Sequence, residues 1–166
     1  MFLNSVKLVV ILAIAGCATV TTRPTWTPMP FDDVEYSALA KEGTGVLRGQ
    51  VFAKTRGGEV KKGAGNPVVM LPATKYGDQR YQEEFIRNKA STHNEDPRYV
   101  QYSRTKITDG EGKFEFTNVP PGKYYLISHV TWESPSSSGG LELQGGRVLG
   151  KFEVKNGVVT DAMLTR

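Results

Sequence analysis

From Gly45 onward, apolar side chains alternate with polar ones, and this period of two is typical of β-strands that bury one face. Turn signals separate the alternating runs at residues 109–112 (Asp-Gly-Glu-Gly), 119–122 (Val-Pro-Pro-Gly) and 155–157 (Lys-Asn-Gly). The pattern predicts an all-β fold, an antiparallel β-sandwich of about seven short strands.

Two segments predict which side chains share a face. Phe114 and Phe116 lie two residues apart, so both should point into the core. In the next strand one face carries Tyr124, Leu126 and Val130, and the other carries Tyr125, Ile127 and His129. Residues 148–154 and 158–164 flank the Asn-Gly pair at 156–157, which predicts a hairpin.

Residues 108–126 read Thr-Asp-Gly-Glu-Gly-Lys-Phe-Glu-Phe-Thr-Asn-Val-Pro-Pro-Gly-Lys-Tyr-Tyr-Leu. This stretch resembles the signature of carboxypeptidase regulatory-like domains, T-D-x-x-G-x-F-x-F followed by V-P-P-G-x-Y-x-L. The resemblance extends over about residues 45–164, within a domain that we place at 45–166. It implies a transthyretin-like (prealbumin-like) sandwich, which serves as a rigid module beside many unrelated activities.

The main departure from this pattern is an insert at residues 74–103, where the period of two is lost. Residues 78–90 are predicted to form a short helix with Asp78 as its N-cap. Tyr81 and Phe85 share roughly one face of it. The helix either packs on the outside of a sheet, over Tyr125, Ile127 and His129, or acts as a ligand-binding lid; the first interpretation is favoured.

The N-terminus has the pattern of a secretory signal. Lys7 precedes an apolar run at residues 8–15, which is far shorter than the ~20 residues of a membrane-spanning helix. The run ends in Ile14-Ala15-Gly16-Cys17, which resembles the lipobox of bacterial lipoproteins. The resemblance implies a signal peptide at 1–16, cleavage between Gly16 and Cys17, and lipid attachment at Cys17.

The mature chain is therefore expected to be anchored to the cell envelope by lipid rather than to span a membrane. Ala18 follows the cysteine, and the absence of Asp there implies the outer membrane in a Gram-negative host. Residues 17–44 are predicted to form a tether, because residues 18–31 are rich in Thr and Pro. Residues 32–42 fit either an extended tether or one helical turn around Tyr36 to Leu39. Within the tether, Trp26 either binds a ligand or, as the favoured interpretation, packs on the domain or lies at the lipid interface.

Charge and composition exclude several classes of function. The formal charge of +4 falls to +3 without Lys7, and no long run of Lys or Arg indicates nucleic-acid binding. The chain has two histidines, His93 and His129, neither with a metal-ligand partner at the right spacing, so no metal and no cofactor are predicted. No catalytic residue set is evident, and the protein is predicted not to be an enzyme.

The sequence thus favours an envelope lipoprotein whose non-catalytic sandwich binds, or structurally supports, a protein or a glycan. The candidate binding surface consists of Tyr81, Phe85, Tyr125, His129 and Trp132, and the wider set of aromatic residues near the insert adds Tyr76, Tyr99 and Tyr102. Two alternatives stay open. One is a small envelope hydrolase using His129 with Ser128, Ser134 or Glu133, and the other is an accessory subunit of an envelope complex.

Overall fold

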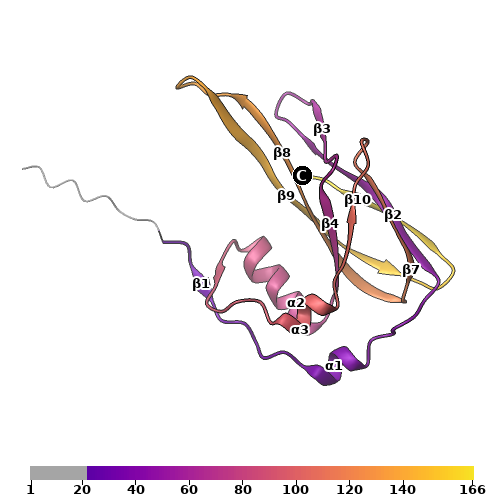
Figure 1. The fold of residues 1–166 in the computed structure, drawn as a ribbon. Helices are drawn as coiled ribbons and strands as arrows, with labels where there is room; N and C mark the ends of the chain where they lie inside the picture. The colour runs from indigo at the N-terminus through magenta and orange to yellow at the C-terminus, as the bar shows by residue number, and fades with distance from the viewer. Residues whose placement is uncertain (1–21) are drawn as a thin grey trace, which may run out of the picture.

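The computed structural model describes residues 22–166, and these form a mostly β structure of two facing sheets (Figure 1). In one sheet β2 (Gly45–Lys54) pairs with β10 (Val159–Leu164), β3 (Val60–Lys62) and β7 (Lys113–Val119). The other sheet has the order β6 (Arg104–Ile107), β4 (Pro67–Pro72), β8 (Gly122–Pro135), β9 (Leu141–Val154). The predicted all-β class is confirmed.

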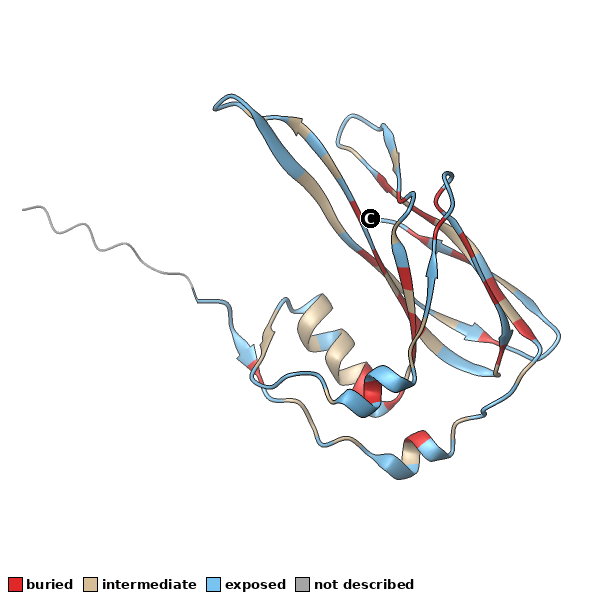
Figure 2. Cartoon of the chain, in the orientation of Figure 1, coloured by how far each residue is buried: buried red, intermediate tan, exposed pale blue. Residues whose placement is uncertain are grey.

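The core lies between the two sheets and follows the alternation of the sequence (Figure 2). Phe114 and Phe116 are both buried there, as predicted, together with Leu126 and Val130 of β8. On the opposite face of that strand, Tyr125 stacks on Tyr81 and Ile127 packs against the second cluster of buried residues. The predicted division of β8 into two faces is therefore confirmed.

The hairpin predicted at residues 155–157 is wrong. The turn is present, since Val158 N donates to Lys155 O at 3.2 Å and Gly157 has φ 68°. However, β10 pairs in parallel with β2 of the opposite sheet and not with β9. The physical reason for this pairing is that β10, by crossing to the other sheet, buries the side chain of Leu164 in the shared core. The turn at 109–112 likewise joins strands of different sheets, β6 and β7.

The segment between β4 and β6 folds over the outer face of the second sheet. It contains α2 (Lys75–Arg80), the π-helix η1 (Tyr81–Ile86), β5 (Ala90–Ser91) and α3 (Pro97–Gln101). The predicted N-cap is wrong, because Thr74 Oγ1 accepts from Gly77 N at 3.2 Å and begins the helix earlier. Asp78 contacts β9 instead, where Lys151 Nζ lies 2.7 Å from its carboxylate.

The chain before β2 also packs on this face. β1 (Thr25–Trp26) pairs with β5, and α1 (Asp33–Ser37) brings Tyr36 to 1% exposure. Trp26 is buried as well, so it packs on the domain. Residues 25–37 are thus part of the folded body, which their Thr- and Pro-rich neighbourhood did not predict. Each helix within residues 22–166 is too short or too polar to span a lipid bilayer. The predicted signal peptide, Gly16 and Cys17 lie outside the described residues.

Candidate functional site

A cluster of aromatic rings joins the N-terminal segment to the insert on the outer face of the second sheet. Tyr36, Tyr76 and Tyr99 are buried there beside Leu71 of β4. Phe31 stacks on Tyr36 with ring centroids 4.2 Å apart, and Tyr76 meets Tyr99 edge-on at 5.1 Å. Such pairs favour fixed relative positions of the rings. Three segments far apart in sequence are therefore held in one arrangement.

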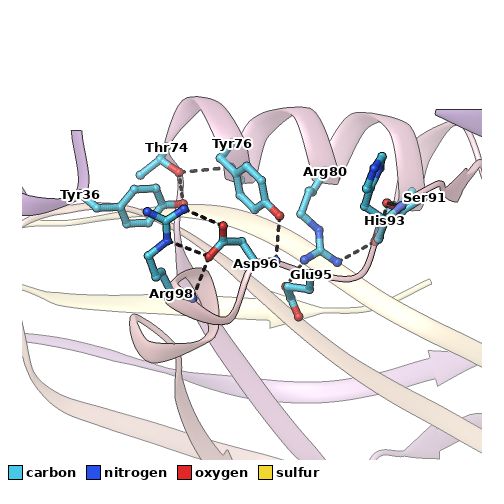
Figure 3. Close-up of polar contacts among 11 residues, drawn as sticks. Tyr36, Thr74, Tyr76, Arg80, Ser91, His93, Glu95, Asp96 and Arg98 are labelled. Atoms are coloured by element: carbon cyan, nitrogen blue, oxygen red, sulfur yellow. Dashed lines mark hydrogen bonds and ion pairs between the residues drawn. The ribbon is translucent and has the colours of Figure 1, made fainter. Parts of the chain in front are cut away.

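Polar contacts bind the same elements together (Figure 3). The hydroxyl of Tyr36 in α1 is hydrogen-bonded to the hydroxyl of Thr74, which also caps α2. Asp96 caps α3 by accepting from Arg98 N at 2.9 Å, and its own N–H donates to the Tyr76 hydroxyl at 3.1 Å. The Arg98 guanidinium pairs with Asp96 at 2.9 Å. This network explains why a short α1 is ordered at all.

A largely buried arginine lies at the other end of the network. The Arg80 side chain is 14% exposed and pairs with Glu84 at 2.9 Å and with Glu95. Its guanidinium lies 5.4 Å from the centre of the Tyr99 ring. Burial raises the pKa of Glu95 above its ordinary value, and Arg80 opposes that rise. Because its contacts are with two acids and an aromatic ring, Arg80 stabilises the structure of the insert.

The Asp96 contacts predict a pH dependence of stability. Hydrogen bonds from Arg98 hold the pKa of Asp96 below its ordinary 3.8. A lowered folded pKa contributes stability above the unfolded pKa, and this contribution is lost as pH falls through the folded pKa. We expect Asp96→Asn, which keeps a capping side chain, to show a shallower loss of unfolding free energy from about pH 5 to about pH 2. Urea unfolding at both pH values measures this, and equal losses in the two proteins would contradict it.

The sequence-predicted binding residues divide between two faces. Tyr81 stacks on Tyr125 at 4.3 Å, and Phe85 lies 6.2 Å from Tyr81, so the insert packs on the outside of the sheet. His129 is exposed on that face, beyond the stacked pair. Trp132 lies on the opposite face and packs against the core between the sheets. The five residues therefore do not form one surface.

Tyr125 is a packing residue rather than an open contact. It is 3% exposed, and its hydroxyl donates to the carboxylate of Asp78. Burial, and then this hydrogen bond, raises the pKa of Tyr125 to about 12. The Lys151 ammonium lies 4.9 Å from the centre of the ring. Tyr125 therefore supports the insert and is closed to a ligand.

The geometry gives no support to the hydrolase alternative. The Ser128 hydroxyl is buried and donates to Pro67 O at 2.8 Å, on the face opposite to His129. Within residues 22–166 no hydrogen bond connects the His129 ring to a serine or an acid. The same part of the chain holds no group of three His, Cys, Asp or Glu side chains arranged to bind a metal.

A pocket of about 360 Å³ lies at the end of the sandwich where the aromatic cluster meets the β7–β8 turn. Its walls come from the residues after α1, the end of α3 with the start of β6, and the turn itself. Such a volume is at the lower end of the range of small-molecule sites. The side chains that give it its chemistry are Tyr36, Tyr102, Tyr124, Lys41, Gln101, Arg104, Asn118 and Lys123.

Two of the tyrosines have different roles in this pocket. Tyr124 is half-buried, and its hydroxyl donates to Pro120 O at 2.9 Å, which fixes the turn. Tyr102 is 41% exposed, with its ring centroid 4.8 Å from that of Tyr36. Tyr36 packs against one side of the Tyr102 ring and fixes its position. The Tyr102 ring therefore presents a fixed aromatic surface at the pocket.

Arg104 fixes the wall on the β6 side. Its guanidinium donates to Thr117 O at 2.6 Å and to Asn118 O at 3.2 Å, and it lies 5.8 Å from the centre of the Phe116 ring. These contacts link the start of β6 to the end of β7. The walls of the pocket are therefore formed in the free protein and need no folding on binding.

The sequence does not indicate this pocket. Tyr102 is among the aromatic residues predicted near the insert, but nothing in the sequence associates it with Tyr36, Lys41 or Lys123. Tyr36 belongs to the segment predicted as a tether, and Lys123 follows the Pro-Pro turn. The apolar spacing of Tyr36 and Leu39 is a signal that could have placed this segment against the domain.

No protein-family model matches this chain, and no curated protein matches it. Among solved structures it is similar to a crystal structure from Pseudomonas aeruginosa, described as a "putative carbohydrate binding protein". The two sequences are 30% identical, and the structures superpose with a TM-score of 0.73. The match covers 84% of this chain and 99% of the Pseudomonas chain.

Proposed function

Because the chain belongs to the same family as this Pseudomonas aeruginosa protein, we propose that it is a lipid-anchored, non-catalytic carbohydrate-binding module of the cell envelope. The proposal places the carbohydrate in the pocket between Tyr102 and Tyr124. The lipid on Cys17 would hold the module at the outer membrane of a Gram-negative host. The carboxypeptidase regulatory-like signature supports a transthyretin-like scaffold without a reaction of its own.

The observation that carries the proposal is the composition of the pocket. Sugar rings combine apolar C–H faces with hydroxyl groups, so they are bound where an aromatic surface lies beside hydrogen-bonding side chains. Tyr102 supplies such a surface, and Gln101, Asn118 and Arg104 supply donors and acceptors around it. The contacts of Arg104 and Tyr124 with the backbone hold the walls in place before binding.

The lining favours binding over hydrolysis. Glycosidases generally need two carboxyl groups on either side of the scissile bond. Among the described residues, no Asp, Glu or His lines this pocket. A bound glycan would therefore meet no general acid or base from these walls.

Exchange of the exposed tyrosine tests the function. Binding should first be screened against a panel of neutral and acidic oligosaccharides by ligand-observed NMR. For the best binder we expect Tyr102→Ala to raise the Kd at least tenfold by calorimetry, a loss of about 1.4 kcal/mol. The fold should persist, because Tyr102 is 41% exposed.

Phe85→Ala is the matched control, because Phe85 is an aromatic residue of the insert that lies away from this pocket. Its Kd should equal that of the wild type. A glycan that binds normally to Tyr102→Ala and poorly to Phe85→Ala would place the site elsewhere. Absence of binding across the whole panel would overturn the carbohydrate function itself.

A further inference from the structure

We infer that the glycan bound by this pocket is acidic: it carries a carboxylate, sulfate or phosphate group that Lys41, Lys123 and Arg104 recognise. The inference rests on the proposed carbohydrate function and adds the chemical class of the ligand. All three cations line the same pocket, although they come from segments far apart in the chain.

The charge of the pocket is not neutralised by its own walls. Within residues 22–166, ten ion pairs are formed, and none of them involves Lys41, Arg104 or Lys123. Glu153 is opposite Lys123 in the β8–β9 register, but it is not part of the lining. Three positive charges around one concavity, with no carboxylate in its described lining, attract an anion.

The three cations also differ in how they can act. Arg104 is held by two backbone carbonyls, so it contributes a fixed positive charge to the wall. Lys41 and Lys123 are exposed, and their ammonium groups can turn toward a ligand. Hydrogen bonds from a cation to an anion are about twice as strong as neutral ones. A neutral sugar would use Tyr102, the amide side chains and the N–H donors of Arg104, whereas an acidic sugar would use the positive charges of Arg104 and the lysines as well.

A ligand pair that shares its sugar backbone but differs in charge tests this inference. Oligogalacturonate and its fully methyl-esterified form share the sugar backbone, but the ester has lost the negative charges. If uronates are the bound class, the wild type should bind the acid at least tenfold more tightly than the ester at low salt. The screen of the proposed function supplies sulfated and phosphorylated oligosaccharides, each to be compared with its uncharged parent in the same way.

The double variant Lys41→Gln and Lys123→Gln should lose most of this preference for the acidic ligand, with the charge of Arg104 leaving a remainder. Lys155→Gln is the control, because Lys155 is an exposed lysine outside the pocket lining. Its affinity should stay within twofold of the wild type. Equal losses in the control and the double variant would show diffuse attraction by net charge and overturn the inference.

The remaining outcomes of the binding experiments distinguish failure of the acidic specificity from failure of the proposed carbohydrate function. If every acidic ligand and its uncharged parent bind equally, and Tyr102→Ala weakens both, the carbohydrate site stands and the acidic specificity is refuted. If only neutral glycans bind, the carbohydrate site again stands and the acidic specificity is again refuted. If no glycan of either kind binds, both the function and the inference fail.

Discussion

Replacement of Tyr36 by alanine is expected to lower the free energy of unfolding by about 3–5 kcal/mol, as removal of a large buried ring does in other proteins. Tyr36 is 1% exposed and contacts the rings of Phe31, Tyr99 and Tyr102. The substitution leaves a cavity where the N-terminal segment meets the insert. Since Tyr36 also supports Tyr102, the pocket should lose its fixed aromatic surface together with the stability.

Tyr36→Phe separates the ring from its hydroxyl. It keeps the packing and removes only the hydrogen bond to Thr74, so it should cost about 1 kcal/mol. Urea unfolding followed by tryptophan fluorescence measures both variants, because Trp26 lies in the same N-terminal segment. A loss below about 1 kcal/mol for Tyr36→Ala would show that residues 25–37 do not pack on the domain as described.

The second large effect is expected from substitution of Cys17, which should remove the lipid completely. Cys17→Ala should abolish lipid attachment, because the cysteine thiol is the group that takes the lipid in proteins with a lipobox. One acyl chain gives only marginal binding and two or more give stable anchoring, so loss of every chain should release the domain from the membrane. If the signal peptidase does not cleave the variant, the precursor stays uncut and likewise carries no lipid.

Labelling of cells with radioactive palmitate, followed by fractionation, measures this effect. The wild type should be labelled and sediment with membranes, whereas Cys17→Ala should carry no label. Ala18→Ser is the control, since it changes the adjacent residue but leaves the lipobox intact. Undiminished labelling of Cys17→Ala would refute the anchor, without bearing on the carbohydrate pocket.

The sandwich could be predicted because its signals are local. The alternation at Phe114 and Phe116 determines which side chains enter the core, and the Pro-Pro turn ends β7 at a defined place. What local signals do not determine is the pairing partner of a strand. The Asn-Gly turn at 156–157 suits a hairpin, yet β10 crosses to pair with β2, where Ala162 and Leu164 are buried in the core.

The pocket could not be predicted, because no single segment contains it. Tyr36 lies in the segment predicted as a tether with at most one helical turn, and its burial arises only from contact with the insert. The candidate surface predicted from the sequence combined Trp132 and Tyr125, although they lie on opposite faces of β8. Periodicity assigns a residue to a face of its strand, but it does not reveal which other segments pack on that face.

On the proposed function, a glycan occupies the pocket between the end of α3 and the β7–β8 turn. Amide chemical-shift mapping with the best oligosaccharide of the panel locates the bound glycan. We predict that the perturbed amides cluster at Gln101, Tyr102, Ser103, Asn118 and Lys123, and that those around Phe85 and Trp132 stay unchanged. Perturbations confined to Phe85, Trp132 or another part of the surface would contradict the claim.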